Sequence, residues 1–212
     1  MDGVIVDSEP QHEQAFLEVF QELGYCDSHG IHFPDYYGRS DRALWVDFVA
    51  QHQPSQSLET LIQLKQDRLL ARLQKTQPIF PGIPELIQSL ATRVPLAVAS
   101  GSSHPVIGVV LAMQDLRRHF PVVVSAQDVS RGKPDPDIFL LAAQKLGVKP
   151  ELCVVIEDSV AGVTAARAAG MKVIAITNSV SADRLHEANA VVSNYNQIHP
   201  LLDLNAHLGG QH

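Results

Sequence analysis

Short apolar runs rich in β-branched residues alternate with helical stretches from about residue 94 onward. The runs are VPLAVAS (94–100), PVVVSA (121–126), LCVVIED (152–158), KVIAIT (172–177) and AVVS (190–193). This alternation is typical of a parallel sheet with helices on its faces. We therefore predict an α/β protein whose core is a Rossmann-like parallel sheet.

Residues 10–78 have a different pattern, which is helical and contains no clear strand. One helical stripe is made by Leu58, Leu61, Ile62, Leu69 and Leu73, and such a stripe is most simply the core of a helical bundle. We predict a helical cap domain at 10–78, inserted into an α/β core formed by 1–9 and 79–212. The segment FPGIPEL (80–86) marks the return of the chain to the core.

Composition and charge narrow the possible partners. The chain has 212 residues, 45% of them hydrophobic, and a formal net charge of -7. This acidic balance argues against binding to nucleic acid or to an anionic membrane, but it leaves room for a local basic pocket that binds a small anion. No apolar run of about 18 residues and no signal-peptide pattern occurs, so we expect a cytoplasmic protein. We also expect a monomer or a weak dimer.

Polar clusters follow three of the predicted strands, where ligands bind in open parallel sheets. The first is Ser100 with Gly101 and Ser102, which places hydroxyl and backbone N–H groups at the start of a helix, a position that favours an anion. The same serines also suit an ordinary helix cap. We therefore expect phosphate binding, capping, or both at this turn.

The other two clusters contain charged residues. Lys133 lies between Gly132 and Pro134, where the proline restricts the backbone, although a solvated surface lysine is the simpler alternative. Glu157 and Asp158 end the apolar run VVI, and two carboxylates at the end of a buried strand repel unless a cation or hydrogen bonds compensate them. An oxygen-ligated Mg²⁺ is the expected partner, whereas helix capping would explain Asp158 alone.

Four motifs occur in an order typical of one enzyme family: MDGVIVDS at the start, ASGSS (99–103), GKPDPDIF (132–139) and VIEDSVAG (155–162). Together they resemble the haloacid-dehalogenase superfamily of phosphatases and phosphomutases. The similar branch contains β-phosphoglucomutase and small sugar-phosphate phosphatases. The resemblance implies a Mg²⁺-dependent phosphatase that acts on a small phosphorylated metabolite, a sugar phosphate, through an aspartyl-phosphate intermediate.

The resemblance also implies roles for individual residues. Asp2 matches the second Asp of the family's Asp-x-Asp motif, which implies the general acid/base and a backbone carbonyl that reaches the metal. Ser100 would bind the phosphate, and Lys133 would neutralise both the phosphate and the attacking carboxylate. Asp158 would ligate the metal, with Glu157 supporting it from nearby.

In the predicted cap, His12 has the spacing from Asp2 at which β-phosphoglucomutase also has a histidine, although a lone histidine on a helix is usually a surface residue. The loop resembling the substrate-specificity loop contains Gly38, Arg39 and Ser40. Asp41 stands where the mutase pattern has Arg, which weakens the case for a phosphomutase unless Arg39 or Arg42 compensates. Alternatively, this loop is only a helix start.

The family's nucleophile is the first Asp of Asp-x-Asp and would fall directly before Met1. The buried strand that carries this Asp contributes on the order of 5 to 10 kcal/mol of stabilisation through burial of apolar surface, and a chain without the strand would lose it. We therefore expect the natural protein to have an upstream apolar strand ending in Asp. Asp7 is the other carboxylate close enough to consider, and a catalytically inactive protein that binds phosphorylated ligands is the remaining alternative.

Overall fold

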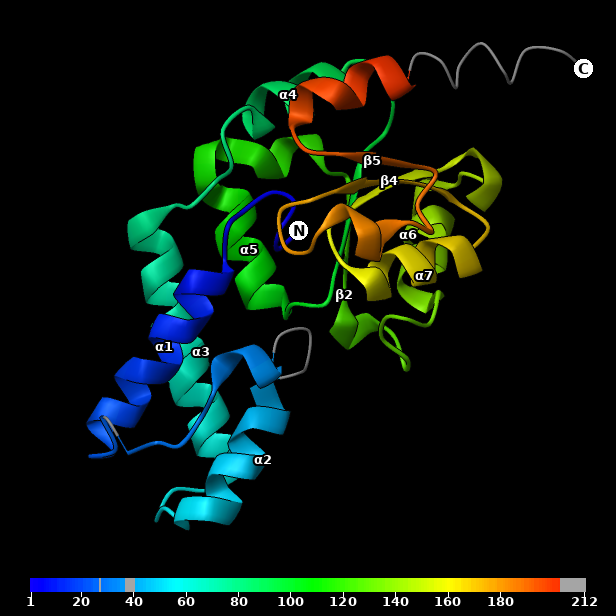
Figure 1. Ribbon diagram of the computed structural model, residues 1–212. Helices are drawn as coiled ribbons and strands as arrows, with labels where there is room; N and C mark the ends of the chain where they lie inside the picture. Colours follow the sequence, from blue (N-terminus) through cyan, green and yellow to red (C-terminus); the bar gives the residue numbers. More distant parts are fainter. Residues whose placement is uncertain (27, 37–40, 203–212) are drawn as a thin grey trace, which may run out of the picture. The chain divides into compact units, whose positions relative to one another are not determined.

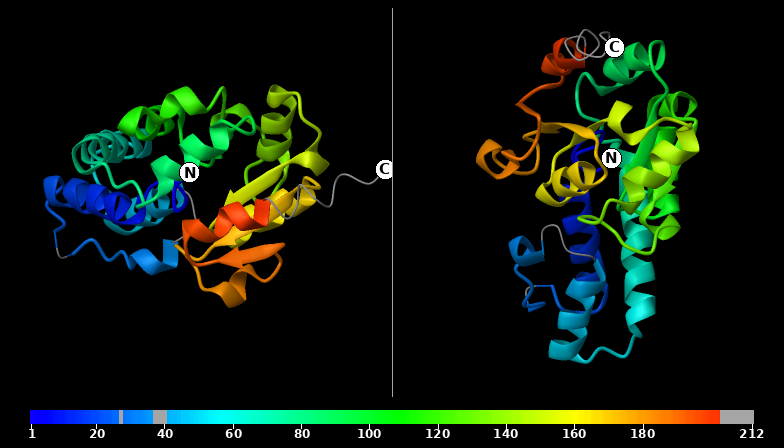
Figure 2. Two further views of the ribbon diagram at one scale, coloured as in Figure 1. Left: turned by 90° about the horizontal axis from the view of Figure 1, so that it is seen from above. Right: turned by 90° about the vertical axis from the view of Figure 1, so that its right-hand side faces the viewer.

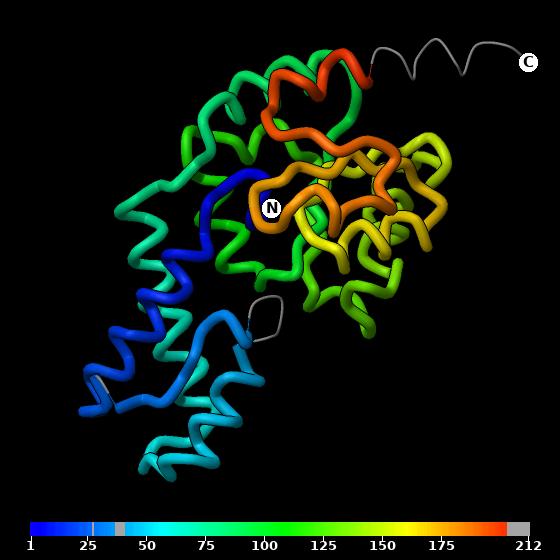
Figure 3. Tube along the Cα trace, viewed as in Figure 1, coloured from blue at the N-terminus to red at the C-terminus, as the bar shows by residue number. Residues whose placement is uncertain are grey.

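The computed structural model describes residues 1–26, 28–36 and 41–202. The chain forms two compact units, which we call the core unit (1–7 and the residues from 79 onward) and the helical unit (8–78). Figure 3 follows the trace as it leaves the core unit after Asp7 and returns to it at Ile79. None of the helices within the described residues is long and apolar enough to cross a membrane.

The helical unit is built around an aromatic core. Its elements are α1 (Glu9–Glu22), the 3₁₀ helix η1 (Phe33–Tyr36), α2 (Asp41–His52) and α3 (Leu58–Thr76). Helices α1 and α3 lie side by side (Figure 1). Phe20 packs against Trp45 and Phe48, with ring centroids 5.3 and 4.8 Å away, and Leu61 of α3 is buried in the same cluster.

Helices and strands alternate in the core unit, as they do in α/β proteins. Its α-helices are α4 (Ile83–Ala91), α5 (His104–Ala112), α6 (Asp137–Leu146) and α7 (Val160–Ala168). Its strands are β1 (Ala97–Ser100), β2 (Val122–Ser125), β3 (Val154–Glu157), β4 (Lys172–Ile176) and β5 (Ala190–Val192). Its 3₁₀ helices are η2 (Met113–His119), η3 (Ala126–Asp128), η4 (Pro150–Leu152), η5 (Ala182–Leu185) and η6 (Tyr195–Gln197).

The strands form two parallel sheets, one of order β1-β2 and one of order β3-β4-β5. Ala97 is paired with Val122 in the first sheet, and Val154 with Lys172 in the second. Both views of Figure 2 show β4 and β5 next to each other. Helix α6 contacts β1 and β2, and α7 contacts β3 and β4. The predicted α/β class with parallel strands is confirmed.

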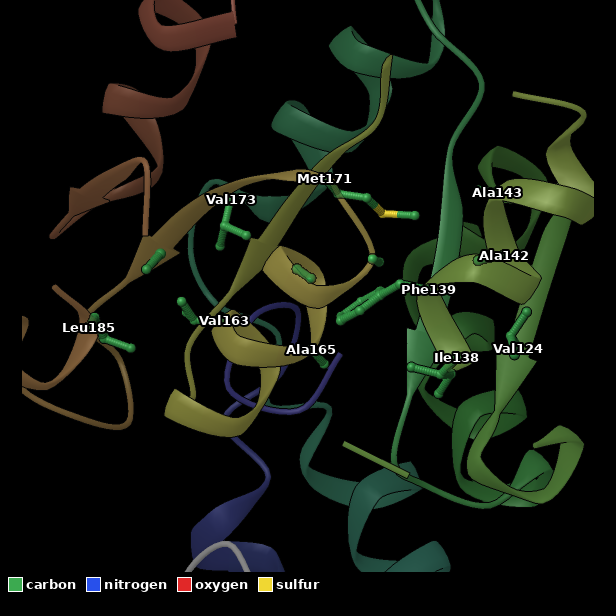
Figure 4. Packing of buried hydrophobic residues seen from close by; sticks show 13 residues of the cluster. Val124, Ile138, Phe139, Ala142, Ala143, Val163, Ala165, Met171, Val173 and Leu185 are labelled. Carbon is green, nitrogen blue, oxygen red and sulfur yellow. The ribbon is translucent and has the colours of Figure 1, made fainter. Parts of the chain in front are cut away.

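One hydrophobic cluster of the core unit lies around α6 and α7 (Figure 4). Ile138 and Phe139 of α6 and Val163 of α7 are buried with Val173 of β4. The helices also contribute small side chains to the cluster, namely Ala142, Ala143, Ala165 and Ala166. Small residues allow closely packed helices, and α6 and α7 contact each other here.

The opening segment is a tight turn fixed to the point where the chain re-enters the core unit. Gly3 donates its N–H to the Val6 carbonyl at 2.9 Å and has a φ of +67°, which favours glycine. Val6 forms an antiparallel bridge with Ile79, and the Phe80 N–H donates to the Ile5 carbonyl at 3.0 Å. Residues 1–3 are therefore held in place by contacts within the core unit.

Candidate active site

Two serines at the end of β1 contact the carboxylate of Asp2. Ser100 Oγ donates to Asp2 Oδ2 at 3.2 Å and Ser102 Oγ donates to the same oxygen at 2.7 Å. The Ser102 N–H also donates to Ser100 Oγ at 3.1 Å, and the exposed Gly101 lies between the two serines. The structure thus brings three of the predicted site residues into one hydrogen-bonded group.

The turn that carries these serines is held by the end of β2. Ser125, which pairs with Ser100 in the sheet, is fully buried and donates its hydroxyl to the Ser102 carbonyl at 2.7 Å. Ser125 Oγ in turn accepts the Gln127 N–H at 3.1 Å. Sequence reasoning did not identify Ser125, although it ends an apolar strand just as Ser100 does.

Lys133 contacts the carboxylate that ends β3. Its Nζ donates to Glu157 Oε1 and lies 5.0 Å from the centroid of the Phe139 ring. Glu157 Oε2 accepts the N–H groups of Asp158 and Ser159 and the Ser159 hydroxyl, each at 2.9 Å. Burial alone would raise the pKa of Glu157, but the charge and hydrogen bond of Lys133 and the hydrogen bond from the Ser159 N–H outweigh it and hold the pKa well below its usual range.

The carboxylate of Glu157 lies directly against the first turn of α7. A Cβ atom at Gly162 would be 2.0 Å from Glu157 Cδ, which is far inside van der Waals contact. The N-cap residue Ser159 accepts the Gly162 N–H at 3.0 Å while it donates to Glu157. Glycine at this position is therefore what allows Glu157 to bind both the helix start and Lys133.

Asp158 is buried beside the opening segment. Burial and the neighbouring charge of Glu157 raise the pKa of Asp158 to about 6, although a hydrogen bond from Ser179 Oγ opposes the increase. A Cβ at Gly3 would be 1.8 Å from Asp158 Oδ2, so this carboxylate lies against the backbone next to Asp2. The ends of β1 and β3 therefore meet the same three opening residues.

A separate polar cluster in the helical unit connects α1, α2 and α3. Lys65 of α3 has no exposed surface, and its Nζ lies 2.7 Å from His12 Nδ1 and donates to Asp41 Oδ2 at 2.7 Å. Burial alone would raise the pKa of Asp41, but His12 and Lys65 outweigh it and hold the pKa well below its usual range. The other predicted cap residues, Gly38, Arg39 and Ser40, lie outside the described residues.

Comparison with known proteins identifies the family. The family model of haloacid dehalogenase-like hydrolases matches residues 1–170. The chain belongs to this hydrolase family. It is 35% identical to hexitol phosphatase B of Escherichia coli (strain K12) over 179 residues, covering 83% of this chain and 80% of that protein. It is 34% identical to fructose-1-phosphate phosphatase YqaB of the same strain over 179 residues, covering 82% and 92%.

Similarity to a solved structure extends over most of the chain. The hydrolase is similar to CbbY from Rhodobacter sphaeroides, which was crystallised in complex with phosphate. The TM-score is 0.78 at 25% identity, and the alignment covers 92% of this chain and 91% of that chain. The predicted membership of the haloacid-dehalogenase superfamily is confirmed by these matches.

The donor set of the hydrolase fits an oxygen-ligated Mg²⁺. No group of three or more His, Cys, Asp or Glu side chains with metal-binding geometry occurs within the part of the chain that the structure describes. Mg²⁺ does not need such a cage, because it is commonly held by one or two carboxylates together with waters and substrate phosphate. Asp158 provides a buried carboxylate that lies against the backbone at Gly3, next to Asp2. Both oxygens of Glu157 already accept protein donors.

Two polar residues after β4 were not predicted, because the predicted polar clusters follow only β1, β2 and β3. Asn178 and Ser179 follow β4, and Ser179 contacts Asp158. Asn178 Nδ2 donates to the Gly3 carbonyl at 2.8 Å and to the Tyr195 hydroxyl at 2.7 Å. Asn178 and Ser179 directly follow the apolar run KVIAIT, and this position is the sequence signal that identifies them.

Proposed function

We propose that this hydrolase is a Mg²⁺-dependent phosphatase that hydrolyses a small sugar phosphate through an aspartyl-phosphate intermediate. The observation that carries the proposal is the carboxylate of Asp2 within hydrogen-bonding distance of Ser100 and Ser102, beside the ends of β1 and β3. The names of two similar proteins, a hexitol phosphatase and a fructose-1-phosphate phosphatase, support the substrate class.

Each side chain has a distinct role in the proposed reaction. Asp2 is the general acid/base, which gives a proton to the leaving sugar oxygen and later takes one from water. Ser100, Ser102 and the N–H groups of the following turn bind the phosphoryl oxygens at the start of α5. Lys133 stabilises the charge on the transferring phosphoryl group, and Glu157 holds its ammonium group in place.

Asp158 would hold the cation through its carboxylate and Asp2 through its backbone carbonyl, with Glu157 supporting them from nearby. When bound, Mg²⁺ neutralises the phosphoryl oxygens and the surrounding carboxylates. The raised pKa of Asp158 supports this assignment, since a buried carboxylate beside a second negative charge is stabilised by a cation.

The helical unit is proposed to act as the cap that recognises the sugar and excludes water. His12 is the candidate sugar contact, with the predicted loop residues Gly38, Arg39 and Ser40. Asp41 supports hydrolysis over phosphomutase activity. It stands where the mutase pattern has an arginine that could bind a second phosphate, and its carboxylate instead accepts a hydrogen bond from Lys65.

The experiment measures phosphate release from hexose and hexitol phosphates with Mg²⁺. The attacking carboxylate implied by the family resemblance would directly precede Met1, so two forms are compared, the 212-residue chain and a chain extended by an apolar strand ending in Asp. We expect turnover and a phosphoenzyme in the extended chain, with at most trace turnover in the shorter one. Robust turnover by the 212-residue chain would mean that another carboxylate attacks phosphorus, with Asp7 the first to test.

Variants of the extended chain test the assigned roles. Lys133→Ala should lose about 2 to 4 kcal/mol of transition-state stabilisation in kcat/KM, whereas Lys149→Ala, which removes an exposed lysine, should leave it unchanged. Asp158→Ala should abolish the Mg²⁺ dependence together with the activity. Undiminished activity in Asp158→Ala, or faster interconversion of glucose 1- and 6-phosphate than hydrolysis of either, would contradict the proposal.

A further inference from the structure

Two successive backbone carbonyls of the opening segment are held by side chains from outside that segment. Asn178, which follows β4, donates from Nδ2 to the Gly3 carbonyl at 2.8 Å. The hydroxyl of Tyr195, in η6, donates to the Val4 carbonyl at 2.7 Å. Both carbonyls come directly after Asp2 in the chain, so these two bonds act on the backbone that carries the proposed general acid/base.

The two side chains also bind each other. Asn178 Nδ2 donates to the Tyr195 hydroxyl at 2.7 Å, in addition to its bond to Gly3. A side-chain amide has two N–H donors and a tyrosine hydroxyl has one, so each donor of this pair is used either on the opening segment or on the other member of the pair. The two side chains therefore hold the opening segment as a unit.

The next residue in the chain, Ser179, contacts the other acidic residue of the site. Its hydroxyl donates to Asp158 Oδ2, and a Cβ at Gly3 would be 2.7 Å from Ser179 Oγ. Two neighbouring residues after β4 therefore contact both the backbone next to Asp2 and the carboxylate of Asp158. Contacts of this kind, made behind the reacting groups, hold a site in its productive geometry.

We infer that Asn178 is a positioning residue for Asp2, with Tyr195 as its support. It fixes the Gly3 carbonyl, and with it the direction from which the backbone presents the Asp2 side chain. Glycine restricts the backbone less than any other residue, so contacts from outside have more influence at Gly3 than they would elsewhere. The inference rests on the proposed function, in which Asp2 gives a proton to the leaving sugar oxygen. Displacing such a group by about 1 Å can lower a rate about 100-fold.

The test uses two substrates that differ in their need for a proton. A sugar oxygen leaves as a basic alkoxide and needs a general acid, whereas 4-nitrophenolate leaves without one. In the chain form that shows turnover, Asn178→Ala should lower kcat/KM at least about tenfold for a hexose or hexitol phosphate, but less than about threefold for 4-nitrophenyl phosphate. Tyr195→Phe should have the same selective effect by a smaller factor. Asn196→Ala, which removes an exposed side chain next to Tyr195, should leave both values unchanged.

Amide hydrogen exchange gives a second readout that does not depend on activity. In the 212-residue chain, Asn178→Ala should speed the exchange of the amides of residues 3–6 at least about fivefold, while the amides of 173–176 in β4 change less than about twofold. Equal changes in kcat/KM for the two substrates, or unchanged exchange at residues 3–6, would overturn the inference. A parent chain that hydrolyses neither substrate would instead refute the proposed function, and the exchange rates would then decide whether Asn178 holds the opening segment.

Discussion

The close approach of Glu157 to Gly162 leads to an unusual prediction for the effect of Gly162→Ala on stability. Replacing glycine by alanine within a helix normally stabilises it by about 0.5 to 1 kcal/mol. In α7, however, the Cβ of Gly162→Ala would lie 2.0 Å from Glu157 Cδ, so the carboxylate would have to move. We therefore expect this substitution to destabilise the protein.

The size of the effect follows from what Glu157 would lose. Its carboxylate pairs with Lys133 and accepts three donors from Asp158 and Ser159, and only 4% of the residue is exposed. Breaking a buried ion pair costs about 3 to 5 kcal/mol. After subtraction of the helix gain, a net loss of about 2 to 4 kcal/mol remains. For a chain of this size, that corresponds to a decrease in Tm of about 5 to 15 °C.

Thermal unfolding followed by circular dichroism measures this loss, and α5 provides a matched control. Gly108 lies inside α5, and a Cβ there would meet no atom within 4 Å. Gly108→Ala should therefore raise the Tm by about 1 to 4 °C. If Gly162→Ala were as stable as Gly108→Ala, the carboxylate of Glu157 could not be held where the structure has it.

Two further predictions concern stability. Asp41→Asn should lower the free energy of unfolding at pH 7 by about 2 kcal/mol, less than for a fully buried pair because Asp41 is partly exposed. Since the folded state depresses the pKa of Asp41, this contribution is present above about pH 4 and is lost as the pH falls below it. Urea unfolding from pH 3 to 7 tests this, with the exposed Asp67→Asn as control, and a pH-independent difference would refute it. Tyr195→Phe removes a hydroxyl that donates to the Val4 carbonyl at 2.7 Å. This substitution should lower the free energy of unfolding, measured by urea titration, by about 1 to 2 kcal/mol. An unchanged free energy of unfolding would contradict this contact.

The sequence was sufficient to locate the strands to within a few residues. Each of the five apolar runs contains one of the strands β1 to β5, because buried parallel strands are apolar on both faces. The polar residues that follow a run could also be identified, since the carboxyl ends of parallel strands meet at one edge of a sheet. Ser100 and Asp158 were found in this way.

Contacts between distant segments could not be predicted in the same way. Lys65 lies on the predicted leucine stripe of α3, and its burial depends on Asp41 and His12, which are 24 and 53 residues away. The spacing places Lys65 on the stripe, but nothing in the sequence identifies the partners that compensate its charge. Likewise, the importance of Gly162 depends on the rotamer of Glu157, which is determined by packing.

The bridge between Val6 and Ile79 has a consequence for how such proteins diversify. The chain leaves the core unit and returns to it at adjacent backbone positions, which are joined in an antiparallel pair like the two arms of a hairpin. In the connectivity of the core unit, the helical unit thus takes the place of a hairpin loop, where long insertions cost little free energy. Recombination at this junction could exchange one insert for another without redesigning the sheets. A lineage with this junction can therefore replace the inserted module while the residues at the strand ends are retained.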